Sequence, residues 1–238
     1  MAEWFEELDD RLWLLPDEEG EEEARFIRRA LRLRRGSRVL DIPCGAGRIA
    51  VHLALAGCRV TGADIRWRFV ARARRRFRAA GVDGAFVTGD MRDADWESEF
   101  NGIYNWGGSF GYFGDEQNAD LIKRFARALR PGGRLLVDLC NREWILRHFL
   151  PEVTTEVRVS RNRWNARRKR IESKYFIDGV HEPKDRSSMR LYTPSEITRM
   201  FERGGLRVDT LYGDWQGSPY TRSGRRLIVV GRRERPAN

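Results

Sequence analysis

Five short apolar segments alternate with helical segments along the chain, and this alternation constrains the fold more than any other feature. The apolar segments lie at residues 38–42, 59–63, 84–88, 101–106 and 134–139, and each is followed by a stretch with the apolar spacing of a helix. Strands separated by helices of this length form right-handed βαβ units and a parallel sheet. The sequence therefore predicts a three-layer α/β fold with a doubly wound, mostly parallel sheet.

Turn and capping residues mark several boundaries. Pro131-Gly132-Gly133 is expected to end one helix before the fifth strand, and Thr193-Pro194-Ser195-Glu196 is a capping box that begins another helix. Between them, residues 151–191 alternate apolar and polar side chains, with Asp178-Gly179 as an expected hairpin turn. We therefore expect an antiparallel β insertion after the fifth strand.

Composition excludes several classes of protein. No stretch approaches the roughly 18 consecutive apolar residues of a membrane helix, and the amino terminus is acidic rather than signal-like, so we expect a cytoplasmic protein without a membrane partner. Cys44, Cys58 and Cys140 lack the paired spacing of a zinc site or disulfide frame, so we expect reduced thiols and no metal. The net charge of +10 raises the question of a polyanionic partner, but the excess is almost all arginine and runs along the whole chain.

A glycine turn joins the first predicted strand to the helix that follows. The segment from Val39 to Ala50 contains Gly45-Ala46-Gly47, and glycines let the backbone turn sharply and approach a ligand closely. Such a turn alone suits NAD as well as other nucleosides.

Three aspartates end successive strands. Asp64, 19 residues after Gly45, is expected to accept hydrogen bonds from ribose hydroxyls, and this also fits NAD. Asp41 precedes the glycines, where a carboxylate would repel a pyrophosphate but favour the ammonium and sulfonium of a methionine tail. Asp90 and Met91 suit an adenine, because the acid can accept from the exocyclic amine while the thioether packs on the ring. Ligands of open α/β sheets bind outside the carboxyl ends of the strands, so we expect the three acids to face one crevice.

These motifs resemble those of class I S-adenosylmethionine-dependent methyltransferases over roughly residues 38–140. The sequence DIPCGAGR resembles the family's first motif, the region of Asp64 and Ile65 its ribose motif, and GDM at 89–91 its adenine motif. Residues 101–113 and the LRPGG turn resemble a bacterial small-molecule subgroup that includes glycine and amino-sugar N-methyltransferases, although Asn101 stands where aspartate is common. The resemblance implies a Rossmann-like fold, S-adenosylmethionine as cofactor and S-adenosylhomocysteine as product.

The resemblance also implies a set of cofactor-binding residues. Asn105 and Trp106 would line the methionine portion and the methyl-transfer channel, and Arg48 would lie near the methionine carboxylate. A core position for Trp106 and a surface position for Arg48 are the alternatives. The full predicted set is Asp41, Gly45, Gly47, Arg48, Asp64, Ile65, Asp90, Met91, Asn105 and Trp106.

Methyl transfer from a sulfonium is an in-line displacement that depends on positioning more than on a strong base. Tyr112, Arg190 and Tyr192 are the candidates for a catalytic role, with ordinary packing as the alternative. We expect the acceptor to be a nitrogen or oxygen of a small metabolite.

Two further hypotheses stay open. An arginine-rich segment at residues 158–170 suits a carboxylate, a phosphate or an RNA backbone, so an anionic small substrate or an RNA substrate would fit it, as would a solvated surface. Against a nucleic-acid methyltransferase, Asn105-Trp106-Gly107-Gly108 differs from the Asn-Pro-Pro-Tyr type of motif. The other hypothesis is a protein that binds the cofactor or a dinucleotide without turnover.

We expect one domain over residues 1–238. Its parts would be a helical lid at 1–35, a cofactor-binding core at 36–150, the insertion at 151–191 as a substrate lid or homodimer contact, and the final helix and strands at 192–238. The acidic run from Asp17 to Glu23 is expected to be a solvated face.

Overall fold

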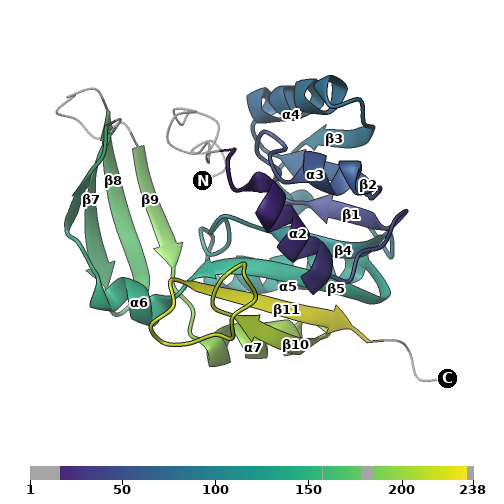
Figure 1. The fold of residues 1–238 in the computed structure, drawn as a ribbon. Coiled ribbons are helices and arrows are strands. Elements are labelled where there is room, and N and C mark those ends of the chain that lie inside the picture. Colours follow the sequence, from purple (N-terminus) through teal and green to yellow (C-terminus); the bar gives the residue numbers. More distant parts are fainter. Residues whose placement is uncertain (1–16, 157, 178–184, 235–238) are drawn as a thin grey trace.

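The computed structural model describes residues 17–156, 158–177 and 185–234, and a seven-stranded sheet forms its centre (Figure 1). The strand order is β10-β11-β5-β4-β1-β2-β3, and six strands run in one direction while β11, between β5 and β10, runs antiparallel to both neighbours. The strands are β1 (Arg38–Asp41), β2 (Arg59–Asp64), β3 (Gly84–Thr88), β4 (Phe100–Asn105), β5 (Leu129–Cys140), β10 (Leu206–Tyr212) and β11 (Arg226–Arg233). The predicted doubly wound, mostly parallel sheet is confirmed.

Helices cover both faces of this sheet and make the three layers. Alternate residues of β1 point to opposite faces, so Val39 belongs to one apolar cluster and Leu40 to the other. Phe26 and Phe77 pack on the first face, and Phe125 and Phe201 pack on the second. The helices are α2 (Gly20–Ala30), α3 (Ala50–Leu55), α4 (Trp67–Ala79), the 3₁₀ turn η2 (Met91–Asp93), α5 (Asp115–Ala128), α6 (Arg142–Arg147) and α7 (Pro194–Arg203).

A second, antiparallel sheet stands beside the carboxyl ends of the parallel strands (Figure 1). It consists of β6 (Glu152–Thr154), β7 (Arg158–Asn165), β8 (Arg170–Ile177) and β9 (Asp185–Arg190), paired in that order. The antiparallel insertion after the fifth strand is therefore confirmed. The expected turn at Asp178-Gly179 lies outside the described residues.

One predicted boundary is confirmed and one is wrong. Thr193 and Glu196 form the expected capping box, in which Thr193 Oγ1 accepts a hydrogen bond from the Glu196 amide (3.2 Å). Helix α5, however, ends at Ala128, and Pro131-Gly132-Gly133 lies inside β5, which is irregular there. Leu129 already has an extended backbone. Arg130 precedes Pro131, and a residue in that position disfavours the helical conformation, so the helix ends earlier than predicted.

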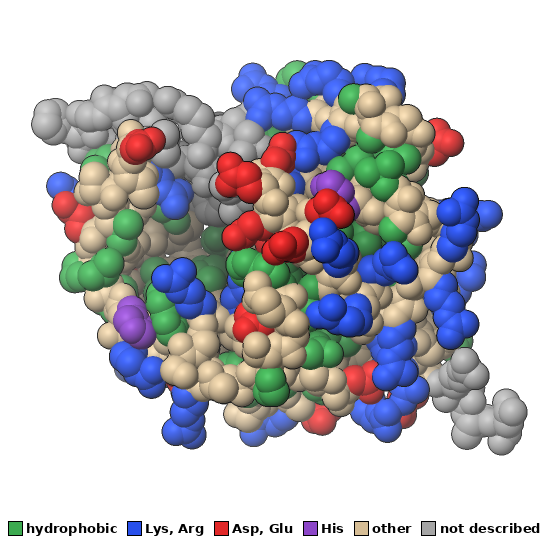
Figure 2. Space-filling view, viewed as in Figure 1, with side chains coloured by type: hydrophobic (Ala, Val, Ile, Leu, Met, Phe, Trp, Pro, Cys, Tyr) green, Lys and Arg blue, Asp and Glu red, His purple; other side chains and the backbone are tan. Residues whose placement is uncertain are grey.

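The acidic run before and within α2 is mostly exposed, and Figure 2 shows acidic side chains gathered over this helix. Glu23 departs from the expected solvated face, because it is only 1% exposed and forms an ion pair with Arg48. It lies on the apolar face of α2, which packs against the core, and an arginine there compensates its charge. Among the described residues, no helix is both long and apolar enough to cross a membrane.

Candidate functional site

A cavity of about 900 Å³ lies at the carboxyl ends of the parallel strands. The core supplies most of its wall, and the second sheet adds Arg158 of β7 and Tyr175 of β8. Eight of the ten predicted cofactor residues line it: Asp41, Gly45, Arg48, Asp64, Ile65, Asp90, Met91 and Trp106. The fold thus brings together, in one cavity, acids that are far apart in the sequence.

The Asp64 carboxylate accepts hydrogen bonds that fix the glycine turn. Asp64 Oδ2 accepts from the Gly45 amide and Oδ1 accepts from the Arg66 amide, each at 2.9 Å. Both turn glycines have positive φ, 51° at Gly45 and 72° at Gly47. A Cβ on Gly45 would have no atom within 4 Å, whereas one on Gly47 would lie 3.0 Å from the Ala73 Cβ of α4. Gly45 therefore borders the cavity, while Gly47 permits close packing and does not line it.

Two buried acids give the cavity a negative end. Asp41 is 3% exposed, and its burial together with the nearby charge of Asp64 raises its pKa well above the usual value. Burial likewise raises the pKa of Asp64. A cation bound beside these carboxyl groups would favour their ionised forms and offset that cost. This end of the cavity therefore suits a positively charged ligand.

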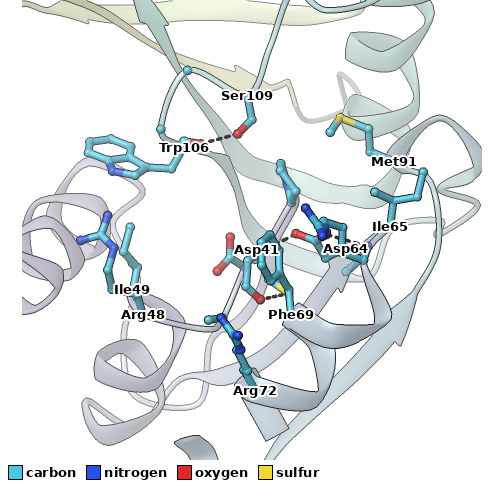
Figure 3. A pocket seen from close by; sticks show the side chains of 18 of the residues that line it. Asp41, Arg48, Ile49, Asp64, Ile65, Phe69, Arg72, Met91, Trp106 and Ser109 are labelled. Carbon is cyan, nitrogen blue, oxygen red and sulfur yellow. Dashed lines mark hydrogen bonds between the residues drawn. The ribbon is translucent and has the colours of Figure 1, made fainter. Parts of the chain in front are cut away.

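Asp90 and Met91 lie at the neighbouring strand end. The Asp90 carboxylate accepts hydrogen bonds from the Arg92 amide (2.8 Å) and the Arg92 Nε (3.1 Å), and although burial opposes ionisation, Arg92 holds the pKa of Asp90 below its usual value. The acid predicted to accept from an adenine amine is therefore already engaged by Arg92. Figure 3 shows Met91 and Ile65 together on one side of the cavity, across from Trp106.

Arg48 and Trp106 form the wall opposite Met91 (Figure 3). Arg48 is 9% exposed, and its guanidinium lies 2.5 Å from Glu23 Oε2, so it is not a surface arginine. Trp106 is 5% exposed and lines the cavity while its ring packs on Phe26, with ring centroids 6.0 Å apart. It is at once a core aromatic and a wall of the cavity.

Asn105 departs from its predicted position. It is fully buried, and its Nδ2 donates to the Ile42 carbonyl at 2.7 Å, so it braces the chain after β1 and does not line the cavity. Successive residues of a strand point to opposite faces, and the next residue, Trp106, lines the cavity instead.

The three candidates for a catalytic role are separated in space. Tyr112 lines the main cavity, and burial raises the pKa of its hydroxyl, which keeps it neutral. Arg190 and Tyr192 instead line a second cavity of about 380 Å³ beside α5 and α7. Arg190 pairs with Glu196 (2.9 Å), and the Tyr192 hydroxyl accepts from Asn118 (2.9 Å). Arg190 and Tyr192 therefore do not line the main cavity, and each has the packing and pairing contacts of the alternative interpretation.

Several cavity residues were not predicted. Asp17, ahead of α2, forms a two-pronged ion pair with Arg76 of α4, with both N–O distances 2.8 Å. Others include Arg66, Phe69, Arg72, Ser109, Phe113 and Tyr175. Five of them follow shortly after the ends of β2 and β4, and this position was the available signal, but nothing in the sequence indicated Asp17 or Tyr175.

The arginine-rich segment 158–170 is divided among separate partners. Arg161 pairs with Glu152 (2.9 Å), and Lys169 pairs with Glu196 (2.6 Å). Arg170 donates to the carbonyls of Gly111 (2.9 Å) and Phe113 (3.0 Å). Arg158 faces the cavity and lies over the Tyr175 ring, 5.2 Å from its centroid. The segment is therefore not one continuous cationic surface. In the described part of the chain, no group of three or more metal-ligating side chains occurs.

Comparison with known proteins gives a consistent result. Residues 39–133 match the family model described as a methyltransferase domain. The chain is 29% identical over 196 residues to a dTDP-3-amino-3,6-dideoxy-alpha-D-glucopyranose N,N-dimethyltransferase of Streptomyces fradiae, covering 75% of this chain and 73% of the relative. It is 26% identical over 214 residues to a cypemycin N-terminal methyltransferase of a Streptomyces species, covering 84% of each. The structure of the CcbJ methyltransferase from Streptomyces caelestis superposes with a TM-score of 0.81 at 16% identity, covering 98% of each chain.

Proposed function

Since the chain belongs to the class I S-adenosylmethionine-dependent methyltransferases, we propose that it methylates an amine nitrogen of a small molecule. The observation that carries this proposal is the single cavity that joins Asp41, Asp64 and Trp106 to residues of the second sheet. Two relatives, named as methyltransferases of a sugar amine and of a peptide amino terminus, support nitrogen as the acceptor atom.

The lining residues fit S-adenosylmethionine. Asp41 would face the positive methionine end, and Asp64, whose oxygens can each accept a second hydrogen bond, would hold the ribose hydroxyls. Met91 and Ile65 would pack on the adenine, while Asp90, tied to Arg92, would fix the turn beneath it. When bound, the cofactor supplies an electrophilic methyl group on a sulfonium.

The rest of the cavity would receive the acceptor. Trp106, Ser109, Tyr112, Phe113, Arg158 and Tyr175 line it there, and the described lining residues include no histidine. The acceptor nitrogen would therefore enter as a neutral amine, held behind the methyl carbon by this wall. Its lone pair would form the new N–C bond as the C–S electron pair returns to sulfur, and the amine proton would pass to solvent.

Arg158 adds a cation to the acceptor end. The described acids of the lining, Asp17, Asp41, Asp64 and Asp90, come from the core and not from the second sheet. An anionic group on the acceptor would be favoured beside Arg158. We also propose that α2 and the second sheet act as two covers of the cavity. An RNA substrate is less favoured, because several cations of the segment 158–170 form ion pairs with glutamates of the same chain.

Calorimetry and turnover test the proposal. Purified protein should bind S-adenosylhomocysteine and not NAD, and with S-adenosylmethionine it should add methyl groups to members of an amine panel that includes dTDP-3-amino-3,6-dideoxy-alpha-D-glucopyranose. Tight NAD binding without S-adenosylhomocysteine binding would overturn it. Binding without turnover of any amine, alcohol or RNA would favour a protein that only holds the cofactor.

A further inference from the structure

Asp138, near the end of β5, is a buried carboxylate with partners on two sides. It is 1% exposed, and its Oδ2 accepts a hydrogen bond from the Gly107 amide at 3.0 Å. The same oxygen accepts from the Arg226 guanidinium at the start of β11. Gly107 and Gly108 both have positive φ, 75° and 70°, so this turn departs from the usual backbone region and needs an external partner to fix it.

The turn held by Asp138 is part of the cavity wall. Trp106, Gly107, Gly108 and Ser109 all line the cavity, and the Ser109 hydroxyl donates to the Trp106 carbonyl at 2.9 Å (Figure 3). Asp138 itself does not line the cavity. Any effect it has on a bound ligand must pass through the turn.

Arg226 links the carboxylate to the tryptophan. Its guanidinium carbon lies 5.4 Å from the centroid of the Trp106 ring and 4.5 Å from that of Trp215. Asp138 thus contacts the turn directly through Gly107 and supports the Trp106 ring through Arg226.

Burying the Asp138 carboxylate has an energetic cost that a neutral side chain would not have. Burial raises the pKa of Asp138 to about 6, against the attraction of Arg226. Glu23 of α2 adds repulsion, and Cys140 also lies within electrostatic range. A neutral side chain could fill the same volume without this cost.

We propose that Asp138 is a positioning residue for methyl transfer, which fixes the Trp106–Ser109 turn through the Gly107 amide and through Arg226. The proposal rests on the proposed function, which assigns this wall to the meeting point of methyl group and acceptor. Misplacement of reacting groups by about 1 Å can lower a rate about 100-fold.

Asp138→Asn is the main test, and Asp209→Asn is the matched control. Asp209 is another ion-paired aspartate of the same sheet, on β10, and it does not line the cavity. With an amine that the wild type methylates, Asp138→Asn should lower kcat about 10- to 100-fold while the KM for S-adenosylmethionine stays within about threefold. Asp209→Asn should change neither.

A second readout needs no acceptor. The emission of Trp106, taken as the difference between wild type and Trp106→Phe, should show a transition near pH 6. That transition should vanish in Asp138→Asn and remain in Asp209→Asn. If Asp138→Asn does not fold, Arg226→Gln should move the transition to higher pH, because the attraction that lowers the Asp138 pKa is removed.

The outcomes separate the two proposals. A wild type that fails to bind S-adenosylhomocysteine contradicts the proposed function. A wild type that binds it, but whose kcat is lowered no more by Asp138→Asn than by Asp209→Asn, contradicts the positioning role of Asp138.

Discussion

Glu23 and Arg48 form a buried ion pair that ties helix α2 to the glycine turn, with Glu23 Oε2 2.5 Å from Arg48 Nη2. Replacing Glu23 by alanine leaves the guanidinium in a buried site without its carboxylate, which typically costs about 3–5 kcal/mol. We expect a lower Tm for Glu23→Ala in calorimetry or circular dichroism. Glu22→Ala, an exposed change on the same helix, should leave Tm nearly unchanged. Equal melting of the two variants would show that the pair does not stabilise α2 on the core.

Asp41→Asn should stabilise the protein without ligand and weaken cofactor binding. The pKa of Asp41 is raised in the folded state, so the folded protein binds more protons than the unfolded chain as the pH rises from about 4. The stability contributed by this group therefore falls as pH rises through that window, and asparagine removes the loss. The Tm advantage of Asp41→Asn over wild type should grow between pH 4 and pH 8.

Asp41→Asn also separates the contribution of charge to cofactor binding from that of shape. Loss of a buried opposite charge should weaken S-adenosylmethionine binding about tenfold or more, and S-adenosylhomocysteine, which lacks the sulfonium charge, should lose less. Calorimetry of both ligands measures this, with the exposed Asp83→Asn as control. An equal loss for the two ligands would argue that Asp41 does not sense the sulfonium.

Asp64→Ala should weaken cofactor binding by about 1.5–3 kcal/mol, or roughly 10- to 150-fold, the usual range for a hydrogen bond to a charged group. The variant also frees the Gly45 and Arg66 amides, which Asp64 now fixes at 2.9 Å each. Asp64→Asn keeps the volume of the side chain and should lie between wild type and Asp64→Ala. Unchanged affinity in calorimetry would remove Asp64 from the ribose site.

Arg170→Lys should loosen the acceptor wall. The Arg170 guanidinium bonds the carbonyls of Gly111, Phe113 and Ser188, and a lysine cannot reproduce this planar arrangement. We expect faster hydrogen exchange across residues 111–113 and a lower kcat/KM for the acceptor, with S-adenosylhomocysteine affinity within about twofold. Arg163→Lys, at an exposed ion pair of β7, is the control. Unchanged exchange would mean that the second sheet does not support this loop.

Sequence patterns over short stretches predicted the secondary structure elements and the residues at their ends. The alternation of apolar segments indicated the parallel strands, and Asp41, Asp64 and Asp90 reached one cavity because parallel strands end at the same edge. The contacts that complete the cavity join distant residues, such as Gly107 to Asp138 and Arg170 to Phe113. No periodicity or capping pattern encodes such pairs, since they depend on how the layers pack.

Asn105 and Glu23 show the same limit at single positions. Whether a residue at the end of a strand points into a ligand cavity or away from it depends on which face of the sheet it occupies. The sequence did not determine this for Asn105, which is fully buried and bonds the Ile42 carbonyl. Glu23 belonged to an acidic run that suggested solvent, yet the helix turned that one carboxylate toward the core.

The two turn glycines differ in what surrounds their α-carbons, and substitutions at them should have different consequences. A D-alanine introduced at position 45 by chemical synthesis would keep the positive φ and direct its methyl group differently from an L-residue, so it would probe how much room the backbone leaves for a ligand. At position 47, an added L-methyl group would press on α4 whether or not a ligand is present. Tolerance at the first position thus reports on binding, and tolerance at the second reports on folding.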